Sequence, residues 1–373
     1  MGAELGQYLA MIPPNATGKP PRVLFLADAG PQIGGGHAMR CLTLADALVR
    51  QGASCAFVAH PGVAAVLRRF ASGGIEVLPA EGEAASALTV AGVGHANAWR
   101  ADVVVVDSYR LGQTDHFGLR GDGRRIVVID DLADRTLDCD VVIDPTFARS
   151  PSAYDELAPA ACERLLGPQY ALLRPEFAAR RAVTLAGRET VGPPGRVLVA
   201  LGLTDVGGVT GEVMSALAPI CSGLAIDVVV GSTAPSLERL RDVAARNPSI
   251  VLHVETQAMA NLTAAADIGV GAGGSSVWER ACLGLPSINV VLAENQGPMS
   301  EALDEAGVLI AIDRRRPDFA AALAASFGGL LADSALRLRL STASSAICDG
   351  AGAAKAAAVM MRVARARPLT KEP

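Results

Sequence analysis

The sequence predicts an α/β protein with two doubly wound, Rossmann-like domains that face each other across a cleft, followed by a helical C-terminal tail. Short Val/Ile/Leu runs alternate with helical patterns along the 373 residues, as in parallel sheets wrapped by helices. A proline-rich stretch at residues 145–194 interrupts this rhythm, which then resumes. Each half also contains a glycine-rich turn between a predicted strand and a predicted helix. This length suits two domains.

The first half contains six continuous apolar runs, which is the pattern of strands buried on both faces. The predicted strands are residues 23–27, 54–59, 75–79, 103–107, 126–130 and 141–144. Residues 81–100 predict a helix of weak periodicity. Polar residues 108–110 and 130–131 directly follow two of the strands. Because ligands of open α/β sheets lie beyond the carboxyl ends of the strands, we expect site residues there.

The second half repeats the pattern, and the chain after Pro317 predicts helices only. Its predicted strands are residues 197–201, 226–231, 250–254, 268–271, 288–292 and 309–312. We therefore expect a loose proline-rich leader at residues 1–21, an N-terminal domain with its linker at residues 22–190, and a C-terminal domain at residues 191–373.

The amino-acid composition argues against a nucleic-acid-binding or membrane-spanning protein. The net charge is −5 and aromatic residues make up 4%, so neither a basic footprint nor a stacking platform for nucleic acid is expected. The seven cysteines are scattered and mostly sit in apolar runs, which favours small buried side chains in a reducing compartment. We expect no membrane span, no secretory signal, no metal and no cofactor, and hence a cytoplasmic protein.

The first glycine turn, Gly34, Gly35 and Gly36, precedes His37 at the start of a predicted helix that is closed by Gly52. A strand, a glycine turn and a helix N-terminus form an anion-binding arrangement. The helix dipole disfavours the imidazolium form of His37, so the ring can accept a proton as a general base. The alternative is a structural histidine at a helix cap.

The second glycine turn runs through Gly273 and Gly274 into Ser275 and Ser276. Its backbone N–H groups and hydroxyls suit a diphosphate, although a plain serine N-cap predicts the same residues. Neither turn has the G-x-x-x-x-G-K-[ST] pattern of a P-loop. The dinucleotide fingerprint and its acidic ribose residue are also missing, so redox chemistry with NAD is disfavoured.

Four further side chains are candidates for substrate contacts. Glu279 lies one helical turn after Ser275 and suits a pair of ribose hydroxyls, unless it is an exposed helix glutamate. The amides of Asn295 and Gln296 follow a strand, where they either contact ligand or open the next helix. Tyr109 is a ligand-facing phenol or an aromatic cover on the core.

Motifs distributed from about Val23 to Gly352 resemble one family. They are D-A at 28–29, Q-I-G-x-G-H-x-M-R-C-L-T-L-A at 32–45, V-V-D-x-Y at 105–109, D-D-L-A-D-R at 130–135, L-G-P-x-Y-A-L-L-R-P-E-F at 166–177, G-A-G-G-S at 271–275, W-E-R at 278–280 and L-A-E-N-Q at 292–296. The family is the nucleotide-sugar hydrolase of pseudaminic acid synthesis, which cleaves UDP-2,4-diacetamido-2,4,6-trideoxy-β-L-altropyranose.

The resemblance implies a two-lobed glycosyltransferase type B architecture, similar to the enzyme that adds N-acetylglucosamine to the peptidoglycan lipid precursor. It implies that the N-terminal domain holds the sugar and the C-terminal domain holds UDP. It implies that His37 is the base for direct attack of water on the anomeric carbon, without a metal. Arg40 belongs to the same motif and is expected among the substrate-binding residues.

Two departures from the family pattern matter. The family usually has Gly-Gly-Ser-Asp where this chain has Gly202, Leu203, Thr204 and Asp205, so a phosphate role for that turn is in doubt. The family often has Asn in the segment that here reads D-P-T at 144–146, which is therefore assigned no role.

The sequence predicts a hydrolase that converts a UDP-sugar to free sugar and UDP, for the synthesis of a nonulosonic acid used in surface or flagellar glycosylation. Two alternatives stay open. One is a glycosyltransferase of the same fold that passes the sugar to an acceptor other than water. The other is a non-catalytic protein that binds a nucleotide sugar.

Overall fold

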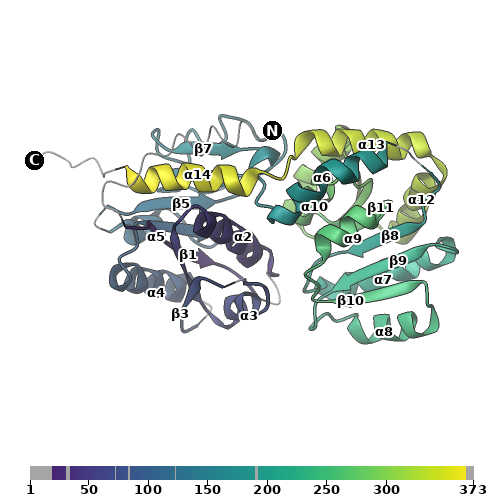
Figure 1. The fold of residues 1–373 in the computed structure, drawn as a ribbon, viewed down its shortest axis with the longest axis horizontal. Coiled ribbons are helices and arrows are strands. Elements are labelled where there is room, and N and C mark those ends of the chain that lie inside the picture. The colour runs from purple at the N-terminus through teal and green to yellow at the C-terminus, as the bar shows by residue number, and fades with distance from the viewer. Residues whose placement is uncertain are drawn as a thin grey trace, which may run out of the picture.

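The computed structural model describes residues 19–30, 34–71, 73–82, 85–121, 123–189 and 192–366. It confirms two α/β lobes side by side, each built on a parallel sheet (Figure 1). Most of the predicted leader, together with the Gln32 and Ile33 positions of the first motif, lies outside the described residues.

The N-terminal lobe contains a seven-stranded sheet in the order β3-β2-β1-β4-β5-β6-β7. Its strands are β1 Arg22–Ala27, β2 Ser54–Ala59, β3 Ile75–Pro79, β4 Val103–Asp107, β5 Arg125–Ile129, β6 Val141–Asp144 and β7 Glu163–Leu166. Six of them match the predicted strands to within a residue. The sequence did not predict β7, because this four-residue edge strand is only partly apolar and lies within the proline-rich stretch.

The C-terminal lobe contains a six-stranded sheet in the order β10-β9-β8-β11-β12-β13. Its strands are β8 Arg196–Ala200, β9 Ala225–Val230, β10 Ile250–Val254, β11 Ile268–Ala272, β12 Ser287–Val291 and β13 Ile310–Asp313. All six were predicted. The central strands β11 and β12 are fully buried, as expected for strands covered by helices on both faces.

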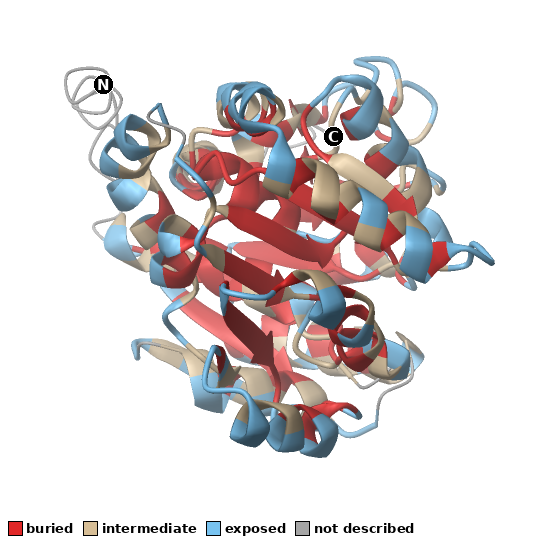
Figure 2. Ribbon diagram, turned by 90° about the vertical axis from the view of Figure 1, so that its right-hand side faces the viewer, coloured by how far each residue is buried: buried red, intermediate tan, exposed pale blue. Residues whose placement is uncertain are grey.

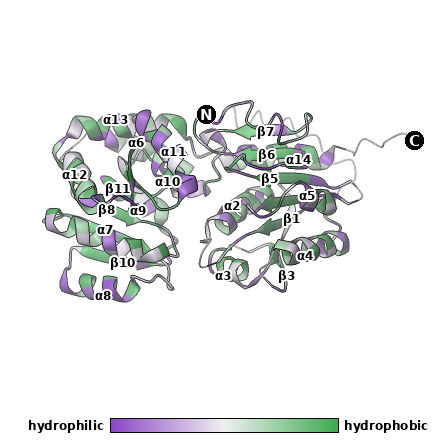
Figure 3. Ribbon diagram, turned by 180° about the vertical axis from the view of Figure 1, so that it is seen from behind, coloured by the Kyte–Doolittle hydropathy of each residue, from purple (hydrophilic) through white to green (hydrophobic). Residues whose placement is uncertain are grey.

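Helices cover both sheets, and their outward faces carry the exposed residues while the strands form the buried layer (Figure 2). They are α2 Gly36–Arg50, α3 Pro61–Phe70, α4 Ala85–Ala98, α5 Gln113–Arg120, α6 Pro175–Arg188, α7 Val209–Leu217, α8 Leu237–Arg246, α9 Met259–Ala265, α10 Ser276–Cys282, α11 Gly297–Glu305, α12 Phe319–Ala332, α13 Ser334–Ile347 and α14 Gly352–Arg365. Viewed from behind, the hydrophobic residues again concentrate on the strands (Figure 3). The all-helical end of the chain was predicted.

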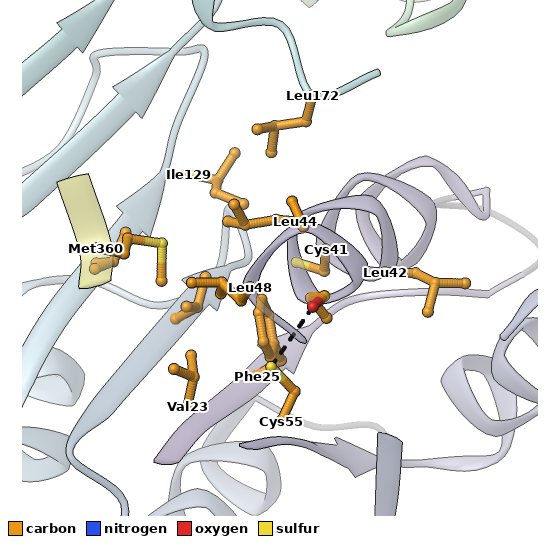
Figure 4. Packing of buried hydrophobic residues seen from close by; sticks show 14 of the residues in the cluster. Val23, Phe25, Cys41, Leu42, Leu44, Leu48, Cys55, Ile129, Leu172 and Met360 are labelled. Carbon is orange, nitrogen blue, oxygen red and sulfur yellow. Dashed lines mark hydrogen bonds between the residues drawn. The ribbon is translucent and has the colours of Figure 1, made fainter. Parts of the chain in front are cut away.

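The last helix, α14, returns to the N-terminal lobe and lies across it (Figure 1). Its apolar side chains, including Met360 and Met361, belong to the same buried cluster as α2 and β1. In close view Met360 lies beside this core, with Leu44 and Leu48 of α2 nearby (Figure 4). The expected boundary near residue 190 counts α14 with the C-terminal domain by sequence, whereas its apolar stripe is buried against the other sheet.

Two sets of contacts join the lobes near the cleft. Arg69 at the end of α3 forms an ion pair with Glu255 at 3.3 Å and accepts a hydrogen bond from Gln257 Nε2 at its carbonyl. A Cβ atom placed on Gly35 would lie 3.7 Å from Leu203 Cδ1, so the turn at residues 34–36 faces the turn that follows β8.

No single helix in the described part of the chain is long and apolar enough to cross a membrane. The segments Phe319–Ala332 and Ser334–Arg365 are long and apolar enough only when taken together, and they are bent by 98° at the break between them.

Candidate active site

Both predicted glycine turns lie where the strand order of a sheet reverses. The N-terminal sheet reverses between β1 and β4, and the C-terminal sheet reverses between β8 and β11. The turn before His37 follows β1, and the turn containing Gly273 follows β11. Since doubly wound sheets bind ligands at these switch points, the topology places one candidate site in each lobe.

His37 is paired with the aspartate that ends β4. Its Nδ1 lies 2.6 Å from Asp107 Oδ1, and the two residues are 7% and 0% exposed. An ionised carboxylate can only accept, so Nδ1 carries the hydrogen and donates it. Nε2 is then the basic nitrogen, and it has no hydrogen-bond partner among the described residues. The pair has the geometry of a base held by an orienting carboxylate.

Arg40 joins this pair to a second carboxylate. It lies one helical turn after His37 on α2 and donates from Nε and Nη2 to the two oxygens of Asp107, at 2.6 and 2.7 Å. Its Nη1 donates to Asp131 Oδ2 at 2.8 Å, and Tyr109 donates to Asp131 Oδ1 at 2.6 Å. The donors of Arg40 are thus used within the protein, which makes it a charge partner of the two aspartates.

Tyr109 closes the cluster over the imidazole. Its ring packs edge-on against the ring of His37, with centroids 4.7 Å apart and an interplanar angle of 81°. This contact and the bond to Asp131 fix the phenol beside the base. Its hydroxyl is bonded within the protein, and a contact of Tyr109 with ligand stays a prediction.

The electrostatics of the cluster keep its acids ionised. Burial opposes the charge on Asp107, but Arg40 and His37 outweigh it and hold the pKa of Asp107 well below its usual range. Burial acts likewise on Asp131, and Arg40 with the Tyr109 hydroxyl lowers the pKa of that carboxyl. Burial, reinforced by Asp131, raises the pKa of Tyr109, so the phenol stays protonated. With His37 neutral, two carboxylates face one guanidinium.

The second turn presents open donors. Gly274 and Ser275 are exposed, and a Cβ on Gly274 would meet no atom within 4 Å. Ser275 occupies the N-cap position of α10, yet its side chain makes no capping hydrogen bond. The simple serine N-cap that the sequence allowed is therefore absent at this residue. The Ser275 hydroxyl is left to face the cleft.

The remaining C-terminal candidates surround this turn. Glu279 is one-fifth exposed and lies 3.8 Å from Arg174, so it is not the freely exposed glutamate of the alternative expectation. Gln296 packs against Gly273, where a Cβ would lie 3.1 Å from its Oε1, and this oxygen accepts from Leu292 N at 3.0 Å. Asn295 is exposed in the short 3-10 turn η4, Glu294–Gln296.

One cleft brings residues of both lobes together. Its lining includes Arg40 and Asp131 from the N-terminal lobe and Gly273, Gly274 and Ser275 from the C-terminal lobe. The apolar side chains of Ile129, Leu172, Leu173, Trp278 and Met299 complete its wall. His37 is not among the residues that line this cleft, whereas its neighbour Arg40 is. Within the described ranges, no cluster of three or more His, Cys, Asp and Glu is arranged to hold a metal ion.

The two departures from the family pattern have structural roles. Leu203 lies against the turn of the opposite lobe, and Asp205 is buried and accepts from Thr210 N and Ser236 N. This carboxylate organises its own loop. Asp144 is likewise buried, accepting from Tyr154 and Arg149, while Thr146 reaches the cleft wall.

Sequence reasoning named the carboxyl ends of β4 and β5 but did not pair Asp107 with His37 or Asp131 with Arg40. The available signal was an aspartate at the end of each strand, and only the strand order shows that β4 is the neighbour of β1. Sequence reasoning also assigned no role to Arg280, a buried residue that donates to Ser276 Oγ beside the second turn.

Comparison with solved structures identifies the fold. The chain superposes on Acinetobacter baumannii MurG with a TM-score of 0.63 and 16% identity, covering 92% of this chain and 100% of that one. It superposes on the S. aureus MnaA–UDP structure with a TM-score of 0.63 and 15% identity, covering 95% and 99%. The protein has the glycosyltransferase type B fold. The calicheamicin glycosyltransferase CalG4 shares this type B architecture, with a TM-score of 0.59, 18% identity and coverage of 94% and 99%.

Two curated proteins are similar to this protein in sequence. The Bacillus subtilis spore coat polysaccharide biosynthesis protein SpsG is 26% identical over 198 residues, which are 52% of this chain and 57% of SpsG. The Campylobacter jejuni UDP-2,4-diacetamido-2,4,6-trideoxy-beta-L-altropyranose hydrolase is 23% identical over 249 residues, or 65% of this chain and 81% of the hydrolase. The chain thus spans little more than half of SpsG. No family model matches the sequence.

Proposed function

We propose that the protein hydrolyses a UDP-sugar to free sugar and UDP. The observation that carries the proposal is the His37–Asp107 pair at the switch point of one lobe, linked through Arg40 to the cleft that the open donor turn of the other lobe also lines. Sequence similarity to a protein named as a UDP-sugar hydrolase supports the reaction class. The type B fold fits a nucleotide-sugar substrate.

In this reaction His37 activates water. Nε2 removes a proton from a water molecule as its oxygen attacks the anomeric carbon, and the imidazolium that forms is stabilised by Asp107 through Nδ1–H. Two carboxylates against one guanidinium give the cluster a net negative charge before the proton arrives. That charge favours both the imidazolium and the positive charge that develops on the sugar ring.

The C-terminal turn receives the leaving group. As the bond from the anomeric carbon to the diphosphate oxygen breaks, its electron pair goes to UDP. Donors at Gly274, Ser275 and Ser276 then stabilise the diphosphate. Because a diphosphate is already a good leaving group, no separate acid is required. Glu279 accepts from the ribose hydroxyls in this arrangement, and Asn295 and Gln296 border the same site.

For the sugar, we propose the diacetamido-trideoxy hexose that the Campylobacter jejuni relative is named for. Such a sugar carries methyl groups on its acetamido substituents and on its ring. The apolar wall formed by Ile129, Leu172 and Met299 suits these groups. The pathway would be pseudaminic acid synthesis in the cytoplasm.

A second candidate is a glycosyltransferase, which the solved structures favour because CalG4 and the spinosyn rhamnosyltransferase SpnG share the fold. It would use the same donor half of the cleft and a different acceptor. In that case His37 would deprotonate an acceptor hydroxyl instead of water.

The experiment supplies purified protein with the UDP-sugar in H₂¹⁸O and no other acceptor. We expect UDP release with no ¹⁸O in UDP, which marks attack at carbon, because the anomeric oxygen of a free sugar also exchanges with water. Label in UDP, or release only after an acceptor is added, would contradict the proposal. His37→Ala should lower the rate about 10²- to 10⁴-fold while UDP still binds.

His253→Ala is the matched control, because His253 forms a similar pair with Asp227, at 2.7 Å, on strands β9 and β10 outside the cleft lining. It should leave the rate unchanged. Equal losses in both variants would point to misfolding rather than to a catalytic role of His37.

A further inference from the structure

Arg280 lies under the donor turn of the C-terminal lobe. It is 5% exposed and comes from α10, the helix that begins at Ser276. Its Nη2 donates to Ala272 O at 3.1 Å and to Asn289 Oδ1 at 2.9 Å, and its Nη1 donates to Ser276 Oγ at 3.1 Å. All three acceptors are neutral, so the guanidinium is hydrogen-bonded without being neutralised.

No carboxylate lies within ion-pair distance of Arg280 in the described part of the chain. Its neighbour Glu279 faces Arg174 instead, at 3.8 Å. Burial lowers the pKa of Arg280 to about 10, an effect that Glu279 only partly opposes. The Nε of Arg280 is buried and makes no hydrogen bond with any described residue. A buried charge of this kind is costly unless something compensates it.

The sequence makes room for this cation. A Cβ on Gly271 would overlap Arg280 Nη1, and a Cβ on Gly269 would lie 3.2 Å from Arg280 Cδ. Both glycines belong to β11 rather than to the turn that follows. Glycine normally weakens a strand interior, so two of them beside one guanidinium indicate that its position matters more than the strand's stability.

The hydrogen bonds of Arg280 set the direction of a hydroxyl donor at the N-terminus of α10. Because Nη1 occupies one lone pair of Ser276 Oγ, the hydroxyl hydrogen of Ser276 is free to point at a ligand. A chain of hydrogen bonds also leads from Arg280 through Asn289. Asn289 Nδ2 donates to Ser300 Oγ at 2.8 Å, and Ser300 Oγ donates to Gln296 O at 2.7 Å. The guanidinium of Arg280 is thus hydrogen-bonded to Ser276 directly and to Gln296 through Asn289 and Ser300.

We propose that Arg280 is a positioning residue and the buried counter-charge of the diphosphate site, acting on the ligand through the Ser276 hydroxyl. The proposal deepens the proposed function and rests on it. A diphosphate at the turn supplies the negative charge that Arg280 lacks, while the guanidinium polarises the Ser276 O–H toward the phosphate oxygens. A nucleoside without phosphate gains nothing from this charge.

The test compares the dissociation constants of UDP and uridine by calorimetry, in wild type, Arg280→Met and Arg280→Lys. We expect Arg280→Met to weaken UDP binding about ten- to a hundredfold and uridine binding less than threefold. Arg280→Lys keeps the charge and should recover part of the UDP affinity. Equal weakening of UDP and uridine, or unchanged UDP affinity, would overturn the proposal.

Arg337→Met is the matched control. Arg337 is 4% exposed in the same lobe and donates only to carbonyl oxygens, those of Leu330, Leu331 and Gly192. Its loss should lower the melting temperature, as we also expect for Arg280→Met, without changing the ratio of UDP to uridine affinity. A change in that ratio equal to that of Arg280→Met would contradict a specific role.

Ser276→Ala keeps the test decisive if Arg280→Met does not fold. It removes only the proposed hydroxyl donor and should weaken UDP about three- to tenfold, with uridine unaffected. Full retention of UDP affinity in Ser276→Ala would overturn the relay. Failure of wild type to bind UDP at all would instead refute the proposed function, so the two failures are distinguishable.

Discussion

The two glycine turns occupy equivalent places in their lobes and differ in what surrounds them. After β1, the turn leads to His37, Asp107, Arg40 and Asp131, where every charge is paired and negative charge is in excess. After β11, the turn presents serine hydroxyls above the unneutralised Arg280. One topology therefore carries two opposite electrostatic environments.

This difference indicates a division of tasks that glycine patterns alone do not reveal. A negative cluster stabilises a proton on an imidazole and positive charge on a sugar. A positive turn stabilises an anion that is leaving. Under the proposed function, the opposite signs align with the dipole that develops when a glycosidic bond to a diphosphate breaks, and the two lobes would act on the two ends of that bond.

The largest effect should come from Asp107→Asn. An amide at this position cannot hold the same tautomer of His37 or stabilise its imidazolium, so we expect kcat to fall roughly 10²- to 10⁴-fold. The dissociation constant of UDP should stay within about twofold, because the donor turn is in the other lobe. Steady-state kinetics and calorimetry measure the two quantities. A parallel loss of UDP binding would show that the lobes do not divide the work.

The two exposed glycines Gly36 and Gly274 offer a sharper comparison. A Cβ added to either would meet no atom within 4 Å, and neither has a positive φ angle, so alanine fits both without strain. Gly274→Ala should weaken UDP about tenfold by keeping the phosphate away from the backbone. Gly36→Ala should leave UDP binding unchanged and lower kcat/KM for the whole UDP-sugar.

Thermal melting checks that Gly36→Ala and Gly274→Ala remain folded, and both variants should melt within a few degrees of wild type. If Gly36→Ala weakened UDP as much as Gly274→Ala does, the diphosphate would contact both turns. The assignment of the N-terminal turn to the sugar and the water would then be wrong.

Much of the fold was predictable because buried parallel strands are continuous apolar runs. The strand β4 reads V-V-V-V-D and was placed correctly, while the mixed E-R-L-L of β7 was not. The candidate site could be predicted where one motif supplies it, as at His37, whose role stays a prediction. It was not predictable where partners meet through strand order, as for Asp107, or where glycines such as Gly271 give space to a distant side chain. The packing of α14 against the N-terminal lobe was not predictable, because its apolar stripe could pack on the core of either lobe.

Acid should destabilise the N-terminal cluster more than the C-terminal turn. The folded-state pKa of Asp107 lies below its unfolded value near 4, so its contribution is present above that value and is lost as the pH falls below it. Burial, opposed by Arg174, raises the pKa of Glu279, so protonating it favours the fold as the pH falls. The free energy of unfolding in urea should fall between pH 6 and pH 3. This decrease should be smaller in Asp107→Asn than in wild type, and larger in Glu279→Gln. Identical pH slopes in all three proteins would contradict these opposite signs.

The smallest effect should come from Leu203, which stands where the family that the sequence resembles usually has glycine. Its side chain faces Gly35 across the lobes, while its backbone carbonyl accepts from Gly231 N at 2.9 Å. If the turn after β8 takes no part in phosphate binding, Leu203→Ala should leave the UDP dissociation constant unchanged and alter kcat/KM by less than about threefold, through one lost contact between lobes. Tighter UDP binding in this variant, measured by calorimetry, would mean that Leu203 blocks a second phosphate contact. In that case the positive half of the cleft would extend from β11 to β8.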